Sequence, residues 1–135
     1  MTKIKLCGLF RPCDIETVNL LKPEYIGFVF APGSKRYISF QRAAELKSLL
    51  APGIKAVGVF TDEAPETVAE LLKDQIIDMA QLHGIESGTY LNQLRSLTEK
   101  PLIKAFRIRS CLDIRAASVC DADYVLLDSG AGTGT

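Results

Sequence analysis

Short apolar runs alternate with longer amphipathic segments along all 135 residues, and this alternation constrains the fold more than any other feature. Six runs are predicted to be strands, and several of them have the near-continuous apolar character of strands that are covered on both faces. They are Ile4–Cys7, Tyr25–Phe30, Ile54–Phe60, Ile77–Leu82, Leu102–Phe106 and Tyr124–Asp128. Strand, helix and strand in repeated succession predict an α/β fold of parallel strands joined by right-handed crossovers.

The segments between these runs are predicted to be helices. They are Pro12–Leu21, Phe40–Leu50, Pro65–Lys73, Ser87–Leu97 and Leu112–Val119. We expect Ser39 to cap the second and Ser110 the fifth, because a serine hydroxyl accepts a backbone N–H of the first turn. We expect Thr61 or Asp62 to begin the third, with Pro65 in its first turn.

Two architectures fit this succession. A doubly wound open sheet closes comfortably in a chain of this length, whereas a barrel needs eight strand–helix units. The strand starts near residues 3 and 124 are five units apart, which gives about 24 residues per unit and about 190 residues for eight units. Spacing alone therefore favours the open sheet, and only the motifs reverse that preference.

Composition restricts the partners. The 16 basic and 16 acidic side chains cancel, which argues against nucleic acid or an anionic membrane as the main partner. No apolar run approaches the roughly 20 residues of a membrane span, and the N-terminus lacks the layout of a secretory signal. Four cysteines occur in no metal-binding spacing: Cys7, Cys13, Cys111 and Cys120. We expect a single cytoplasmic domain with reduced thiols and no metal.

The first motif is the segment Lys5–Pro12. Alternation places Lys5 and Cys7 on one face of a strand, with Cys7 at the carboxyl end that faces the ligand in parallel α/β proteins. A thiol in that position can become a thiolate base. A buried structural cysteine is the alternative interpretation.

Two further motifs follow strand ends. In Gly27–Tyr37, Arg36 lies in a loop after an apolar strand, where a guanidinium can bind a carboxylate or phosphate with two hydrogen bonds. A solvated basic loop is the alternative. In Gln81–Gly84, His83 is the only histidine of the chain and shares a face with Gln81. It can transfer protons or simply line the pocket, and we favour the lining role.

The fourth motif, Tyr124–Thr135, places Asp128 at a strand end before a glycine-rich loop. Flanking apolar surface would favour its protonated form and let it act as a general acid. Gly132 and Gly134 can present backbone N–H groups to a phosphate, although a plain turn is the simpler interpretation. The glycines match a dinucleotide fingerprint only weakly, because no helix and no acidic ribose ligand follow.

Together the four motifs and the Val57–Phe60 strand resemble the phosphoribosylanthranilate isomerase family in order and spacing. The shared segments are Lys5–Pro12, Gly27–Arg36, Val57–Phe60, Gln81–Gly84 and Leu126–Thr135. The resemblance covers all 135 residues. It implies a partial (βα)8 TIM barrel, in which residues 1–135 form the N-terminal three-quarters as a single domain of about six parallel strands and five helices.

The resemblance also implies an activity in tryptophan biosynthesis. The family is an aldose–ketose isomerase, an intramolecular oxidoreductase, that converts N-(5-phosphoribosyl)anthranilate to 1-(2-carboxyphenylamino)-1-deoxyribulose 5-phosphate by an Amadori rearrangement without cofactor or metal. By similarity, Asp128 is the general acid that opens the furanose and Cys7 is the base that removes the C2 proton. Arg36 then anchors the anthranilate carboxylate.

The remaining matched residues receive lesser roles from the resemblance. Lys5 and His83 would line the pocket, and Gly132 and Gly134 would supply part of the phosphate site. The sequence departs from the family pattern in its Gly-Ala-Gly-Thr-Gly loop and at Phe10 and Cys13, where the family loop is usually more polar.

The sequence ends within the loop after the sixth strand, whereas loops after the seventh and eighth strands commonly hold the phosphate in such barrels. An alternative function is therefore an inactive folded fragment or assembly subunit that needs a complementing C-terminal part. Open sheet edges further predict a homo-oligomer or a complementing chain.

Overall fold

The computed structural model describes residues 1–129. Strands and helices alternate in the predicted order, with bounds that differ by a few residues from those expected. The elements are β1 (Lys5–Cys7), α1 (Pro12–Leu21), β2 (Tyr25–Val29), α2 (Phe40–Ser48), β3 (Lys55–Phe60), α3 (Pro65–Lys73), β4 (Met79–Leu82), α4 (Gly88–Leu97), β5 (Leu102–Arg107), α5 (Cys111–Ser118) and β6 (Tyr124–Asp128).

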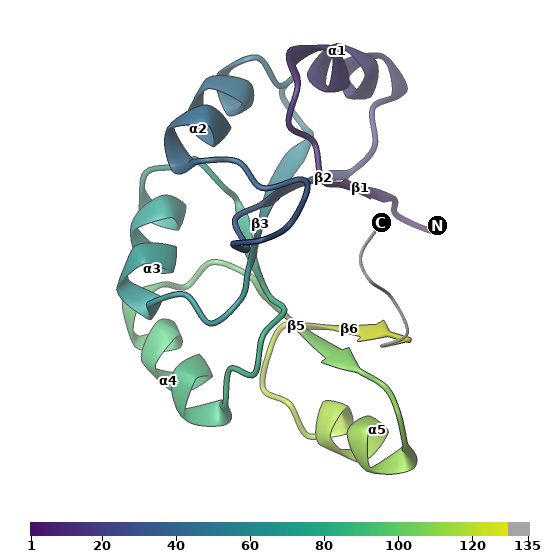
Figure 1. Ribbon diagram of the computed structural model, residues 1–135, viewed down its shortest axis with the longest axis vertical. Helices are drawn as coiled ribbons and strands as arrows, with labels where there is room; N and C mark the ends of the chain where they lie inside the picture. Colours follow the sequence, from purple (N-terminus) through teal and green to yellow (C-terminus); the bar gives the residue numbers. More distant parts are fainter. Residues whose placement is uncertain (130–135) are drawn as a thin grey trace.

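The sheet distinguishes the two expected architectures. Its strands follow one another in the order β1-β2-β3-β4-β5-β6, and every neighbouring pair is parallel. A doubly wound sheet would reverse its strand order at a switch point, so the open-sheet alternative is excluded. Figure 1 shows the helices along the outside of the curved sheet, with β1 and β6 at its two ends. Residues 1–129 form a half-barrel of six parallel strands and five helices.

The outer face of the sheet forms the core with the helices. Phe28, Phe60 and Leu82 on the strands are fully buried, as are Leu46 of α2 and Leu94 of α4. Burying each such side chain contributes about 1.5–3 kcal/mol to stability. The helices are thereby fixed to one side of the sheet, and the strand ends that they connect are fixed with them.

The inner face carries the residues that alternate with the core residues. Register partners in parallel strands share a face, so Cys7 lies beside Gly27 and Asp128 beside Arg107. A hollow of about 390 Å³ opens on this face. Its lining includes Lys5, Tyr25, Val57, Met79, Ile103 and Leu126.

Two of the predicted helix starts are confirmed. The Ser39 hydroxyl accepts a hydrogen bond from the Arg42 N–H at 3.1 Å, and the Ser110 hydroxyl accepts one from the Leu112 N–H at 3.3 Å. Each hydroxyl satisfies a backbone donor that the first turn of a helix leaves without a partner.

The third helix has the predicted bounds, with Pro65 in its first turn, but the prediction that Thr61 or Asp62 begins it is wrong. Ala64 is the residue that precedes α3, and no side chain among residues 1–129 caps this helix. Asp62 adopts a left-handed backbone conformation with φ of 51°, and its carboxylate accepts the N–H of Ile85 at 2.9 Å. The side chain that could have capped the helix thus ties the β3–α3 loop to the β4–α4 loop.

Both ends of the sheet expose apolar side chains, as the sequence predicted. The exposed residues at these ends are Ile4 and Leu6 around β1, Tyr124, Val125 and Leu127 on β6, and Leu112, Ile114 and Val119 around α5. Within residues 1–129, no helix has the length and apolarity needed to cross a lipid bilayer.

Candidate active site

Four of the predicted site residues lie at the carboxyl ends of the strands. Cys7 ends β1 and Asp128 ends β6, while His83 directly follows β4 and Arg36 lies in the loop after β2. In barrel enzymes this rim holds the active site. The fifth, Lys5, lies on β1 two residues before Cys7 and therefore on the same face of the strand. The remaining two, Gly132 and Gly134, lie outside the described residues.

Cys7 is exposed, which is contrary to its alternative interpretation as a buried structural cysteine. Its thiol lies over Gly27, the residue that faces it on β2. A Cβ atom at position 27 would be only 2.5 Å from the Cys7 Sγ. The glycine therefore makes room for the thiol on the inner face, and any larger residue would displace it.

Arg36 lies next to Cys7. Its Nη1 donates a hydrogen bond to the carbonyl oxygen of Cys7 at 3.2 Å. The side chain passes over Gly8, whose φ of 90° favours glycine and whose position leaves no room for a Cβ atom beside the guanidinium. A guanidinium has five N–H donors. Within residues 1–129 this is its one side-chain hydrogen bond, so donors remain to bind an anion beside the thiol.

A chain of polar side chains crosses the inner face from β1 to β6. The Lys5 ammonium donates to the Gln81 Oε1, and the Gln81 Nε2 lies 3.1 Å from the His83 Nδ1. The His83 Nε2 lies 3.4 Å from the Asp128 Oδ2. Gln81 is only 3% exposed. The sequence placed Gln81 on the same face as His83 but did not reveal this connecting role.

The surroundings of Asp128 differ from the prediction. Its side chain is 39% exposed and contacts His83, so the described residues do not surround it with apolar surface. Its β5 register partner is Arg107, a cation. Val125 and Leu127 of β6 lie on the opposite face from Asp128, and Leu126, which shares its face, leaves the carboxylate partly exposed.

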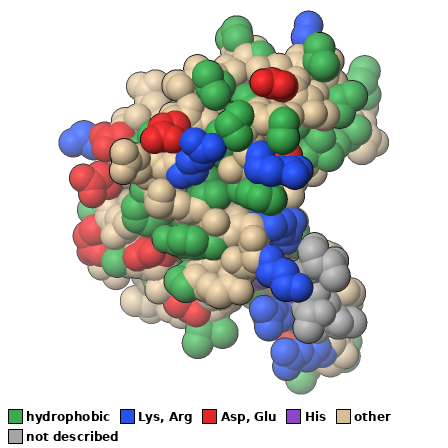
Figure 2. Space-filling model, turned by 45° about the horizontal axis from the view of Figure 1, so that its top comes forward, with side chains coloured by type: hydrophobic (Ala, Val, Ile, Leu, Met, Phe, Trp, Pro, Cys, Tyr) green, Lys and Arg blue, Asp and Glu red, His purple; other side chains and the backbone are tan. Residues whose placement is uncertain are grey.

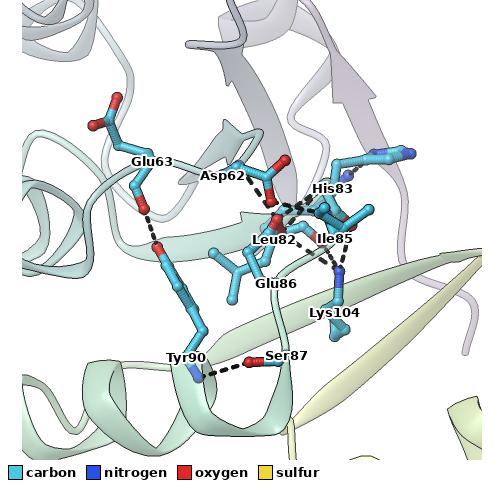
Figure 3. A network of polar contacts seen from close by, with 11 residues as sticks. Asp62, Glu63, Leu82, His83, Ile85, Glu86, Ser87, Tyr90 and Lys104 are labelled. Carbon is cyan, nitrogen blue, oxygen red and sulfur yellow. Dashed lines mark hydrogen bonds and ion pairs between the residues drawn. The ribbon is translucent and has the colours of Figure 1, made fainter.

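A buried ion pair fixes the loop that carries His83 (Figure 3). The side chains of Glu86 and Lys104 are 1% and 6% exposed, and their charged atoms are 3.4 Å apart. Glu86 accepts the N–H of Gly84 at 2.8 Å, while the Lys104 ammonium donates to the Gly84 carbonyl at 2.9 Å. Both charged groups thus hold the backbone immediately after His83.

The sequence analysis missed this ion pair. Lys104 stands within the apolar run Leu102–Phe106, and a charged residue inside a buried strand usually requires a partner. That signal could have identified Lys104. Nothing local could have identified Glu86 as its partner, because the two residues belong to different units.

Tyr90 extends the same network to α4. Its hydroxyl donates to the Glu63 carbonyl at 2.7 Å. Burial, together with the nearby carboxylate of Glu86, raises the pKa of Tyr90 well above its ordinary value. The phenol therefore remains a donor, and it links α4 to the β3–α3 loop.

Charged residues of both signs line a hollow beside His83. Its volume is about 550 Å³, and its lining includes the basic residues Lys104, Arg107 and Arg109 and the acidic residues Asp62, Glu86 and Asp113. Lys104 is already paired with Glu86, so Arg107 and Arg109 are the cations of this lining that can attract an anion. Figure 2 shows Lys and Arg side chains gathered around the hollowed side of the molecule. Neither arginine was predicted as a site residue, although Arg107 directly follows the apolar run Leu102–Phe106.

The described residues contain no cluster of three or more His, Cys, Asp or Glu side chains that could hold a metal ion. The expected absence of a cofactor stays a prediction. What the rim does bring together is an exposed thiol, a carboxylate linked to an imidazole, and a guanidinium. These are acid–base and anion-binding groups at the carboxyl ends of parallel strands, the arrangement of a (βα)-barrel enzyme.

Comparison with known proteins identifies which barrel family this is. The family model of N-(5'phosphoribosyl)anthranilate (PRA) isomerase matches residues 4–135, and the chain belongs to this family. The resemblance predicted from the sequence motifs is thereby confirmed.

Individual relatives support the same family membership. The N-(5'-phosphoribosyl)anthranilate isomerase of Endomicrobium trichonymphae is 42% identical over 129 residues, which are 96% of this chain and 62% of that protein. The crystal structure of the Thermus thermophilus isomerase superposes with a TM-score of 0.83 at 32% identity, covering 96% of this chain and 65% of that one. An isomerase crystallised with reduced 1-(o-carboxyphenylamino)-1-deoxyribulose 5-phosphate has a TM-score of 0.82 at 30% identity, covering 95% and 65%. The chain thus spans about 62% of the length of the curated relative.

Proposed function

We propose that this chain carries the acid–base site of a phosphoribosylanthranilate isomerase. The observation that carries the proposal is the placement of Cys7 and Asp128 at the carboxyl ends of β1 and β6, on one concave face. Arg36 lies against Cys7, and His83 lies against Asp128. Family membership supports the assignment of the reaction.

The proposed reaction is an Amadori rearrangement. Protonated Asp128 delivers its proton to the furanose oxygen of N-(5-phosphoribosyl)anthranilate while the C1–O bond breaks and the anthranilate nitrogen forms a C=N bond. The Cys7 thiolate then removes the C2 proton, and the C–H electrons neutralise the iminium as an enamine. Tautomerisation of the enol gives 1-(2-carboxyphenylamino)-1-deoxyribulose 5-phosphate. No external oxidant is required, because C1 is reduced as C2 is oxidised.

The other predicted residues would bind the substrate. Arg36 is proposed to hold the anthranilate carboxylate, since its guanidinium is fixed beside the thiol. Lys5 and His83 line the inner face. Gly132 and Gly134 are proposed to contribute to phosphate binding. The arginines at this end of the sheet, Arg36, Arg107 and Arg109, suit a substrate that carries both a carboxylate and a phosphate.

A second candidate function is a folded subunit that turns over substrate only when another polypeptide completes it. The exposed apolar residues on β1 and β6 favour this candidate, because such edges readily pair with another chain. Association would make the protein an oligomer.

A cytoplasmic location is proposed from the four cysteines that occur as free thiols in the described residues.

Loss of the anthranilate fluorescence of the substrate would test both candidates. The chain is assayed alone and with a complementing polypeptide that contains the last two units of a relative, beside Cys7→Ala and Asp128→Asn variants. Turnover that both variants abolish supports the isomerase. Turnover only in the complemented sample supports the completed subunit. Turnover that survives both substitutions would contradict the proposed acid and base.

A further inference from the structure

The polar chain Lys5–Gln81–His83–Asp128 has a fixed direction. An ammonium group only donates hydrogen bonds, so the Gln81 oxygen must face Lys5. The opposite amide orientation would bring two groups of donors together. The Gln81 NH2 is therefore directed at the His83 Nδ1, 3.1 Å away. The chemistry of Lys5 alone determines this orientation.

The direction continues through the imidazole. A nitrogen that accepts a hydrogen bond from an amide NH2 cannot carry a proton itself, so Nδ1 of His83 is unprotonated. In a neutral imidazole the other nitrogen then holds the proton. The Nε2–H of His83 consequently donates to the Oδ2 of Asp128, 3.4 Å away.

We propose that Lys5 and Gln81 are positioning residues that fix His83 as the Nε2–H tautomer and thereby leave the Oδ1 of Asp128 to the substrate. Since Oδ2 accepts the imidazole N–H, a proton on the carboxyl group is carried by Oδ1. This inference rests on the proposed role of Asp128 as general acid. It assigns the proton to one oxygen and gives Lys5 and Gln81 a function apart from contact with substrate.

The location of Gln81 supports a role within this chain of contacts. The residue is buried on β4, and both ends of its amide are used, one by β1 and one by the loop after β4. A buried amide without partners costs about 1–3 kcal/mol. An apolar residue would fill the same space without that requirement, so packing alone does not account for a glutamine at this position.

Other ionisable groups also face His83. Lys5 of β1 contacts the His83 partner Gln81, and Arg107 of β5 is the register partner of Asp128 on β6. The charged residues that share its hollow are Asp62, Glu86, Lys104, Arg107, Arg109 and Asp113. Among residues 1–129, only Gln81 and Asp128 make side-chain hydrogen bonds to the imidazole.

The test is nitrogen NMR of the imidazole in the substrate-free chain at about pH 8, where an ordinary imidazole is neutral. His83 is the only histidine, so its two ring nitrogens are assigned without ambiguity. We expect a pyridine-like Nδ1 and a pyrrole-like Nε2. A proton on Nδ1 in the unsubstituted chain would overturn the proposal without any variant.

A Gln81→Glu substitution supplies the sharper test. A carboxylate between Lys5 and His83 can only accept, so we expect Nδ1 to gain a proton and its signal to become pyrrole-like. In Lys5→Met the amide can turn, and we expect both nitrogens to shift toward intermediate values. Gln41→Glu, the same change at an exposed site on α2, is the control and leaves both signals unchanged.

An Nδ1 that stays pyridine-like in folded Gln81→Glu would overturn the proposal, and so would an unchanged spectrum in folded Lys5→Met. Folding is verified by methyl dispersion in the same samples. The experiment needs no turnover, so a chain that shows the expected tautomers but is inactive both alone and with the complementing polypeptide would contradict only the proposed function. Conversely, an active chain with protonated Nδ1 would contradict only the tautomer assignment.

Discussion

Removing the Lys104 ammonium should destabilise the protein far more than removing an exposed cation. Lys104→Met keeps most of the side-chain volume but leaves the Glu86 carboxylate, only 1% exposed, without its cation. It also removes the donor that holds the Gly84 carbonyl at 2.9 Å. Breaking a buried ion pair from one side costs about 3–5 kcal/mol. We therefore expect the free energy of unfolding to fall by about that amount.

Arg42→Met is the matched control. Arg42 pairs with Glu45 on α2, where the side chains are 41% and 52% exposed, and such a pair contributes about 0.2–1 kcal/mol. The assay is urea denaturation followed by circular dichroism, with equal m-values as the condition for comparing free energies. The double variant Lys104→Met with Glu86→Leu should be more stable than Lys104→Met alone, because no buried charge remains without a partner.

A loss of less than about 1 kcal/mol in Lys104→Met, the range of an exposed pair, would contradict this expectation. That outcome would mean that water reaches Glu86 or that the carboxylate is protonated at little cost. A second readout concerns the loop. Because Lys104 and Glu86 both bind the backbone at Gly84, the imidazole signal of His83 should broaden or shift in Lys104→Met and stay unchanged in Arg42→Met.

Three further outcomes are expected. Gly27→Ala places a Cβ 2.5 Å from the Cys7 Sγ, and a resulting shift of the thiol by about 1 Å should lower turnover by about 10²-fold. Unchanged turnover, together with an unchanged rate of Cys7 alkylation measured by mass spectrometry, would show that the thiol does not need the space above Gly27. Burial raises the pKa of Asp123, but hydrogen bonds from a backbone N–H and from Arg95 lower it further, so that the net shift is downward. A carboxyl group with a lowered folded-state pKa contributes stability that is present above its unfolded-state pKa and is lost as pH falls through the folded-state value. Below about pH 4, the free energy of unfolding should therefore fall less steeply with decreasing pH in Asp123→Asn than in the unsubstituted chain. The same pH dependence in both chains would contradict this. Finally, light scattering should show concentration-dependent association that Leu127→Lys reduces, since Leu127 is exposed on the edge strand β6. A monodisperse monomer before substitution would contradict association through this strand.

Local patterns predicted the strands and most helices because burial imposes local regularity. Continuous apolar runs gave β2 through β5, and the serines at positions 39 and 110 gave two helix starts. The prediction that Thr61 or Asp62 begins α3 failed for a tertiary reason, although the helix bounds were correct. Asp62 uses its carboxylate on the N–H of Ile85, 23 residues further along the chain, and no local pattern indicates that choice.

The strand order could not be deduced from spacing, which favoured an open sheet. Unit lengths of a doubly wound fold and of a barrel overlap, so only the family motifs predicted the sequential order. Once the order is known, Cys7 and Asp128 follow from the rule that ligands meet the carboxyl ends of parallel strands. The contacts between side chains, such as that of Lys5 with Gln81, join residues 76 positions apart and require the register.

The carboxyl end of β4 is held from both of its faces, and this gives His83 its position. On the inner face, Gln81 contacts the imidazole at Nδ1. On the outer face, Lys104 and Glu86 bind the backbone of Gly84, and in the plane of the sheet the N–H of His83 donates to the Phe60 carbonyl at 2.8 Å. The contact of Gln81 orients the imidazole ring, whereas the contacts of Lys104 and Glu86 fix the backbone that carries it. A substitution of Lys104, whose side chain does not touch the imidazole, should therefore still affect the hydrogen bond between His83 and Asp128.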